Sequence, residues 1–138
     1  MIFPQWLKVY GDQEYRGPCP QETVEQVSII NQIRKAYPCT YGRVATHIRN
    51  EGKRTFNQAI RHKADGLVKG APDLIIPGMV TFICEIKRKN HTLSRWQDGQ
   101  LEYLETARKL GSFVCVALGA EAAWQAFEDW RKENEIQT

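Results

Sequence analysis

The chain has 138 residues, of which 42% are hydrophobic and 25% charged, and its formal net charge is +3. These values are typical of one ordinary globular domain, and no apolar run approaches the roughly 18 residues of a membrane span. The four cysteines form no CxxC pair, which argues against a zinc site and favours a reducing compartment. We therefore expect a cytoplasmic protein with no membrane partner.

The first half of the chain alternates between irregular and periodic stretches. Residues 1–19 contain scattered Gly and Pro and predict an irregular N-terminal arm with one short strand at residues 6–10. From Pro20, apolar residues recur every three to four positions, which predicts a helix that ends before Pro38. Residues 41–49 alternate and predict a strand, residues 50–54 a turn, and residues 55–66 a short helix with Gly66 past its end.

The second half contains two short apolar runs, residues 73–78 and 80–87, joined through Pro-Gly, which predicts a hairpin. Residues 94–111 predict a helix with Ser94 as its cap and Gly111 past its end. A wholly apolar strand and an amphipathic helix follow, at residues 112–118 and 120–134. The order α-β-α-β-β-α-β-α predicts an α/β fold in which residues 20–138 form a single domain, a mixed sheet flanked by helices.

Positive charge is concentrated in the middle of the chain. Residues 41–70 contain seven Lys or Arg against two acids, whereas the tail after Glu128 is acid-rich. Such a distribution fits a surface that binds a polyanion, and on charge alone a solvated charged face is an equally good interpretation.

The hairpin carries three ionisable residues within apolar runs, Asp73, Glu85 and Lys87. Because side chains alternate along a strand, Glu85 and Lys87 share one face, and a hairpin lets Asp73 approach them. Two close carboxylates repel unless a cation lies between them. Carboxylate oxygens with the Ile86 carbonyl favour Mg²⁺ or Mn²⁺ over zinc, and the lysine is placed to orient an attacking water. For an ExK pattern alone, a solvated Glu/Lys pair is the better interpretation.

The stretch Pro72-Asp73 followed by Glu85-Ile86-Lys87 resembles the motif of PD-(D/E)XK nucleases. The ordered set "NEGKR", "GLVKGAPDLIIPG", "FICEIKRKNHTLSRWQDGQ" and "LGSFVCVALGAEAA" is similar to the VRR-type nuclease branch, over residues 22–130. The resemblance implies a restriction-endonuclease-like fold and a Mg²⁺- or Mn²⁺-dependent endonuclease of phage or bacteria that acts on junctions, flaps or nicked duplexes. A chain of this size would cut both strands as a homodimer. The alternative is a non-catalytic nucleic-acid-binding module on the same fold.

Carried over residue by residue, the resemblance makes Asp73, Glu85 and Lys87 the catalytic core. It also implies an acid on the first helix, for which we expect Glu22 with Glu25 as the alternative. The glutamine of the following helix is expected at Gln100, with Gln97 as the alternative. The expected metal ligands are Asp73, Glu85, the Ile86 carbonyl and Glu22. The expected DNA contacts are Arg49, Asn50, Lys53, Arg54, Lys69 and Lys89.

Overall fold

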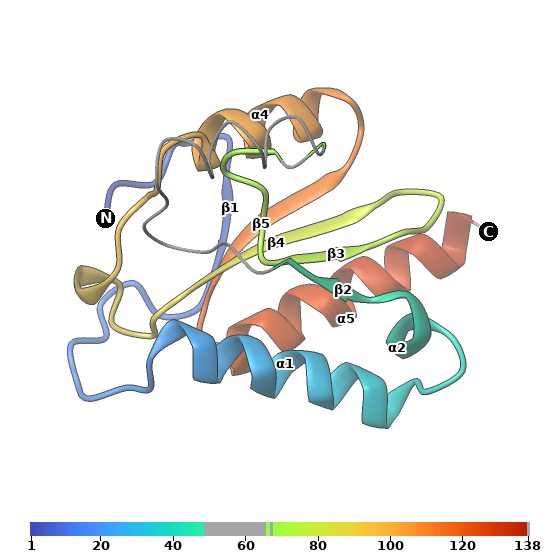
Figure 1. The fold of residues 1–138 in the computed structure, drawn as a ribbon, viewed down its shortest axis with the longest axis horizontal. Helices are drawn as coiled ribbons and strands as arrows, with labels where there is room; N and C mark the ends of the chain where they lie inside the picture. The colour runs from blue at the N-terminus through green and yellow to red at the C-terminus, as the bar shows by residue number, and fades with distance from the viewer. Residues whose placement is uncertain (49–65, 67, 138) are drawn as a thin grey trace.

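A computed structural model describes residues 1–48, 66 and 68–137 of the chain, and Figure 1 shows their arrangement. The elements of this described part are, in chain order, β1 (Lys8–Tyr10), α1 (Glu22–Ala36), α2 (Tyr41–Val44), β2 (Thr46–His47), β3 (Leu74–Ile76), β4 (Phe82–Lys87), the short 3₁₀ helix η1 (His91–Leu93), α4 (Gln100–Lys109), β5 (Phe113–Leu118) and α5 (Ala120–Gln137). The predicted turn at 50–54 and helix at 55–66 lie outside the described residues, apart from Gly66.

The strands form one mixed sheet in the order β1-β5-β4-β3-β2. The two longest strands, β4 and β5, run parallel at its centre, and β1 pairs parallel with β5. On the other side, β3 is antiparallel to both β4 and β2, with Leu74 opposite Cys84. The structure therefore confirms the predicted α/β fold, the hairpin and the central strand.

Helices cover both faces of the sheet, α1 and α5 on one and α4 on the other (Figure 1). The face toward α1 and α5 holds the larger core, including Ile33, Phe82, Phe127 and Trp130. The face toward α4 holds a smaller cluster that includes Leu104. Because both faces of β4 and β5 are covered, all their residues are buried, which explains the continuous apolar sequence of β5 and of the first half of β4.

Helix α1 ends as the sequence predicts. Ile29, Ile30 and Ile33 recur on one side and are buried against the sheet. The helix stops at Ala36 because Tyr37 precedes Pro38, and a residue before proline is sterically excluded from the helical conformation.

The predicted strand at residues 41–49 is wrong over its first half. Residues 41–44 instead form the one-turn helix α2, and of the described residues 41–48 only Thr46 and His47 pair in the sheet. Gly42 explains the difference, because a Cβ at this position would lie 2.6 Å from the Arg34 Cα and from the Tyr37 carbonyl oxygen. The lack of a side chain lets α2 pack directly against the end of α1, which an alternating pattern does not reveal.

The predicted helix at residues 94–111 is too long at its start. Helix α4 begins at Gln100, and its N-cap is Gly99 rather than Ser94. Gly99 has a φ of +86°, which excludes it from a right-handed helix, and a Cβ there would lie 2.9 Å from the Lys69 carbonyl oxygen. The chain therefore turns sharply where it meets Lys69 and Gly70, and the helix starts only after that turn. The predicted end holds, because Gly111 follows Leu110 with a φ of +101°.

The N-terminal arm contributes the edge strand β1, inside the range predicted at residues 6–10. The remaining arm residues before α1 are irregular apart from turns, and Arg88 donates hydrogen bonds to the Cys19 and Pro20 carbonyls. The arm is thus attached to the sheet, and a separate domain boundary at residue 19 stays a prediction.

Candidate active site

The β3–β4 hairpin brings Asp73 next to Glu85. Leu74 pairs with Cys84, so one step further in this antiparallel register Asp73 lies opposite Glu85. The Ile86 N–H donates a 2.8 Å hydrogen bond to Asp73 Oδ2, and Asp73 and Glu85 are both buried. Since the N–H and C=O of one strand residue point to the same edge, the Ile86 carbonyl also faces the Asp73 side. Two carboxylates and one carbonyl therefore converge at this end of the hairpin.

Lys87 lies beside these carboxylates with only 1% of its surface exposed. Its Nζ donates to the Arg95 carbonyl at 2.8 Å and to Gln100 Oε1 at 3.0 Å. Glu85 Oε1 and Glu22 Oε1 lie 3.8 and 3.9 Å from the same nitrogen. A buried lysine needs such partners. They hold the Lys87 ammonium on the same face of β4 as the Glu85 side chain.

The structure separates the two candidate glutamines. Gln100, at the first position of α4, donates from Nε2 to Glu85 Oε1 at 3.0 Å and accepts from Lys87 Nζ. The Gln97 side chain is exposed, and its backbone N–H donates to Gln100 Oε1 at 2.8 Å. Gln100 is therefore the glutamine brought to Glu85 and Lys87, because the turn at Gly99 places the start of α4 over this end of β4.

The two acids of the first helical turn also diverge. Glu22 approaches Lys87 and accepts a 2.9 Å hydrogen bond from the Ser94 hydroxyl. Glu25 Oε2 accepts a 2.8 Å hydrogen bond from the Ala120 N–H at the start of α5. Gly119, with a φ of +96°, leaves room for this contact, because a Cβ there would lie 2.5 Å from Glu25 Oε2. Glu25 thus caps α5, whereas Glu22 belongs to the cluster around Lys87.

Glu85 has an unusual electrostatic environment. Burial raises its pKa well above the ordinary value, the nearby Asp73 raises it further, and Lys87 opposes the shift. Among the described residues, no donor lies within hydrogen-bonding distance of Glu85 Oε2. An unpaired buried carboxylate oxygen beside a second carboxylate is a suitable ligand pair for a hard divalent cation.

The protein itself supplies few ligands to such a metal site. Within residues 1–48, 66 and 68–137, no three His, Cys, Asp or Glu side chains are grouped closely enough to hold a metal by themselves. Asp73, Glu85 and the Ile86 carbonyl fit a Mg²⁺-type ion all the same, because Mg²⁺ is usually bound by one or two carboxylates and keeps waters or substrate oxygens in its other positions.

The expected DNA contacts are only partly described. Lys69 is exposed, and its Nζ lies 3.3 Å from Asp98 Oδ2. Lys89 is also exposed, and its Nζ lies 4.5 Å from the centre of the Tyr15 ring. Both lie on the surface outside the buried cluster. The four others lie outside the described residues: Arg49, Asn50, Lys53 and Arg54.

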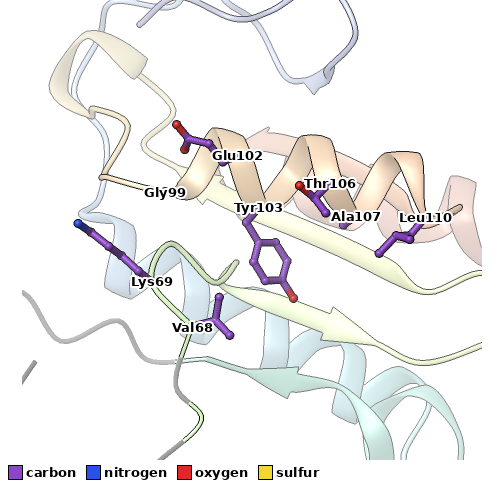
Figure 2. A pocket seen from close by; sticks show the side chains of 8 residues that line it. All are labelled: Val68, Lys69, Gly99, Glu102, Tyr103, Thr106, Ala107 and Leu110. Carbon is purple, nitrogen blue, oxygen red and sulfur yellow. The ribbon is translucent and has the colours of Figure 1, made fainter. Parts of the chain in front are cut away.

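A mainly apolar pocket of about 450 Å³ lies along α4, next to Lys69. Figure 2 shows Tyr103 extending from α4 toward the segment that carries Val68, with Lys69 and Glu102 near Gly99. The pocket contains none of the residues that surround Lys87, so it is separate from the polar cluster.

The sequence did not predict the contacts that Ser94 and Trp96 make near Lys87. Ser94 was expected to cap a helix, but it contacts Glu22 and the backbone of Arg88. The Trp96 ring lies 5.4 Å from Lys87 Nζ, and its Nε1 donates to the Ile2 carbonyl. The polar residues between the ExK motif and the next helix were the available signal for both.

The sheet topology and the buried Asp-Glu-Lys cluster define a restriction-endonuclease-like α/β fold. A solved structure described as "VRR_NUC domain protein" superposes with a TM-score of 0.65 and 21% sequence identity, over 86% of this chain and 92% of that one. This likeness confirms that the chain has the fold of a VRR-type nuclease domain. Neither a protein-family model nor a curated protein sequence matches the chain. In the described part of the chain, no helix has the length and apolar character needed to cross a bilayer.

Proposed function

We propose that the protein is a metal-dependent endonuclease that hydrolyses DNA phosphodiester bonds. The observation that carries this proposal is the convergence of Asp73 and Glu85 at the buried end of the hairpin, with Lys87 beside them. An acid pair with one unpaired oxygen and a neighbouring ammonium is suited to a reaction that builds negative charge on a phosphate.

In this proposal Asp73, Glu85 and the Ile86 carbonyl hold Mg²⁺ or Mn²⁺, with Glu22 assisting directly or through water. The ion, when bound, stabilises negative charge on the scissile phosphate and on the leaving oxygen. Lys87 positions the attacking water. Gln100 links Glu85 Oε1 to Lys87 Nζ and so holds the acid and the lysine in a fixed relation.

The preference for branched, flapped or nicked DNA rests on the resemblance to VRR-type nucleases, as does action as a homodimer in a bacterial or phage-infected cell. Binding of the DNA backbone is assigned to Lys69 and Lys89 of the described residues, and to Arg49, Asn50, Lys53 and Arg54. Because these contacts are to phosphates, binding is expected to weaken steeply as the salt concentration rises.

The test is a panel of labelled linear, nicked, flapped and four-way-junction DNA, incubated with Mg²⁺ or Mn²⁺ beside Asp73→Ala and a sample with excess chelator. We expect the wild-type protein to cut at least one branched substrate, and neither control to do so. If the wild-type protein binds these DNAs but cuts none under either metal, the non-catalytic binding module is the better account. Cutting that survives Asp73→Ala would contradict the site assignment.

A further inference from the structure

Ser94 makes two hydrogen bonds that join separate parts of the candidate site. Its hydroxyl oxygen accepts from the Arg88 N–H at 3.0 Å and donates to Glu22 Oε2 at 2.9 Å. Arg88 directly follows Lys87 at the end of β4, while Glu22 begins α1. One hydroxyl thus connects the strand that carries the lysine to the helix that carries the third acid.

Glu22 has few other restraints on its side chain. About a third of its side-chain surface (32%) is exposed, against 2% for Lys87, and it lies in the first turn of its helix. A glutamate this exposed ordinarily samples several rotamers. With Oε2 held by Ser94, Oε1 faces Lys87 Nζ at 3.9 Å, so one oxygen is fixed and the other is directed toward the cluster.

Ser94 is itself well fixed. It lies in extended backbone with φ −115° and ψ 168°, directly after η1, and its N–H donates to the His91 carbonyl. One residue further on, the Arg95 carbonyl accepts from Lys87 Nζ. The same short segment therefore restrains both the lysine and, through Ser94, the acid of α1.

We infer that Ser94 is a positioning residue that holds the Glu22 carboxylate toward Lys87 and the proposed metal site. The inference rests on the proposed function, which gives Glu22 its role. Ser94 does not touch the reacting atoms and acts only through Glu22. Residues that orient a metal-site carboxylate from behind typically change metal affinity or activity by roughly 10- to 100-fold when they are removed.

The experiment is a double-mutant cycle of Ser94→Ala and Glu22→Ala, read out by Mn²⁺ binding in a calorimetric titration and by the unfolding equilibrium of the metal-free protein. Ser94→Ala is expected to weaken Mn²⁺ binding about tenfold, and to weaken it no further once Glu22 is alanine. Ser94→Thr keeps the hydroxyl in extended backbone, which β-branched residues adopt readily, and should restore binding to within about twofold. The effects of Ser94→Ala and Glu22→Ala on the equilibrium constant of unfolding should be non-additive by a factor of about 3 to 10.

Ser28→Ala is the matched control. Ser28 is exposed on α1, the helix that carries Glu22, and is neither of the two residues varied in the cycle. It should leave Mn²⁺ binding unchanged. If Ser94→Ala weakens Mn²⁺ binding equally in the wild-type and Glu22→Ala backgrounds, or leaves it unchanged, the positioning role is wrong while the nuclease proposal stands. Additive unfolding effects would likewise overturn it. Absence of any Mn²⁺ binding by the wild-type protein would overturn the metal-dependent function and the positioning role together.

Discussion

The two faces of strand β4 differ in composition although they alternate along the same six residues. Toward α1 and α5, the strand presents Phe82, Cys84 and Ile86, and the Phe82 ring lies 5.4 Å from the Trp130 ring. Toward α4, it presents Ile83 and then the charged residues Glu85 and Lys87, both about 1% exposed. One face is therefore apolar throughout, and the other becomes ionic at its C-terminal end.

This difference indicates how the fold tolerates a buried charged cluster. Burying Glu85 and Lys87 opposes folding, because their hydration is lost and their mutual attraction only partly replaces it. The apolar face, with its aromatic side chains and the continuous register to β5, stabilises the strand independently of those charges. We therefore expect substitutions on the two faces to affect different measurable quantities.

The largest effect is expected for Lys87→Ala on the charged face. Loss of the ammonium that we propose positions the attacking water should lower the cleavage rate by about 10²- to 10⁴-fold. The rate should be measured at saturating Mg²⁺ on the best substrate of the DNA panel. Lys109→Ala, on the exposed surface of α4, is the matched control and should cut at the wild-type rate. Equal rates for both variants would remove Lys87 from the chemistry.

The next effect is expected for Trp130→Ala on the apolar side. Trp130 is fully buried, and its Nε1 donates a 2.7 Å hydrogen bond to the Val80 carbonyl. Its loss should lower the free energy of unfolding by about 3–5 kcal/mol, as measured by denaturant titration. Where the variant remains folded, its cleavage rate should stay close to that of the wild-type protein. A variant of normal stability but without activity would show that the two faces are not separable in this way.

A smaller effect concerns pH. Burial and the nearby Asp73 raise the pKa of Glu85 in the folded protein. At pH values between the unfolded and folded pKa, Glu85 is therefore protonated in the folded protein and ionised in the unfolded chain. The metal-free protein should therefore lose stability as the pH rises from the unfolded pKa through the raised folded one. Glu85→Gln should remove this loss, so that the free energy of unfolding of the variant changes less with pH across this range. Identical pH profiles for the two proteins would contradict the account of this carboxyl group.

The smallest effect compares the two acids of α1. Glu25→Ala removes the carboxylate that accepts from the Ala120 N–H, and should cost about 1 kcal/mol in the free energy of unfolding with little change in cleavage. Glu22→Ala should cost a similar amount of stability, because it loses the Ser94 hydrogen bond, but it should also lower the cleavage rate. Thermal unfolding and cleavage measured on both variants test this. If Glu25→Ala has the larger effect on cleavage, the assignment of the two acids must be exchanged.

Much of the fold could be predicted because the hydrophobic pattern determines it. Residue patterns predicted three of its features: the periodic isoleucines of α1, the apolar strand β5 and the hairpin that places Asp73 near Glu85. The one-turn helix α2 was not, because it depends on the close approach of Gly42 to α1. A contact between segments brought together only by folding leaves no periodic signal in the sequence.

The candidate site could be predicted as a set of residues but not in its detail. Spacing alone left Glu22 and Glu25 as alternatives, since both lie in the first helical turn, and left Gln97 and Gln100 unresolved. The choice depends on where α5 and α4 begin, and Gly99 and Gly119 determine this through their positive φ angles. Ser94 was misassigned for the same reason, because the N-cap of α4 is Gly99, five residues after the position that the polar pattern indicates.

The central claim is that Asp73 and Glu85 form a divalent-metal site on the ionic face of the hairpin. The most direct measurement is a calorimetric titration of the metal-free protein with Mn²⁺, compared with Asp73→Asn and Glu85→Gln. We predict saturable binding to the wild-type protein that is at least about 100-fold weaker in each variant, because each loses one of the two buried carboxylates that converge at the end of the hairpin. Saturable binding of equal strength in all three proteins, or none in the wild-type protein, would contradict the claim.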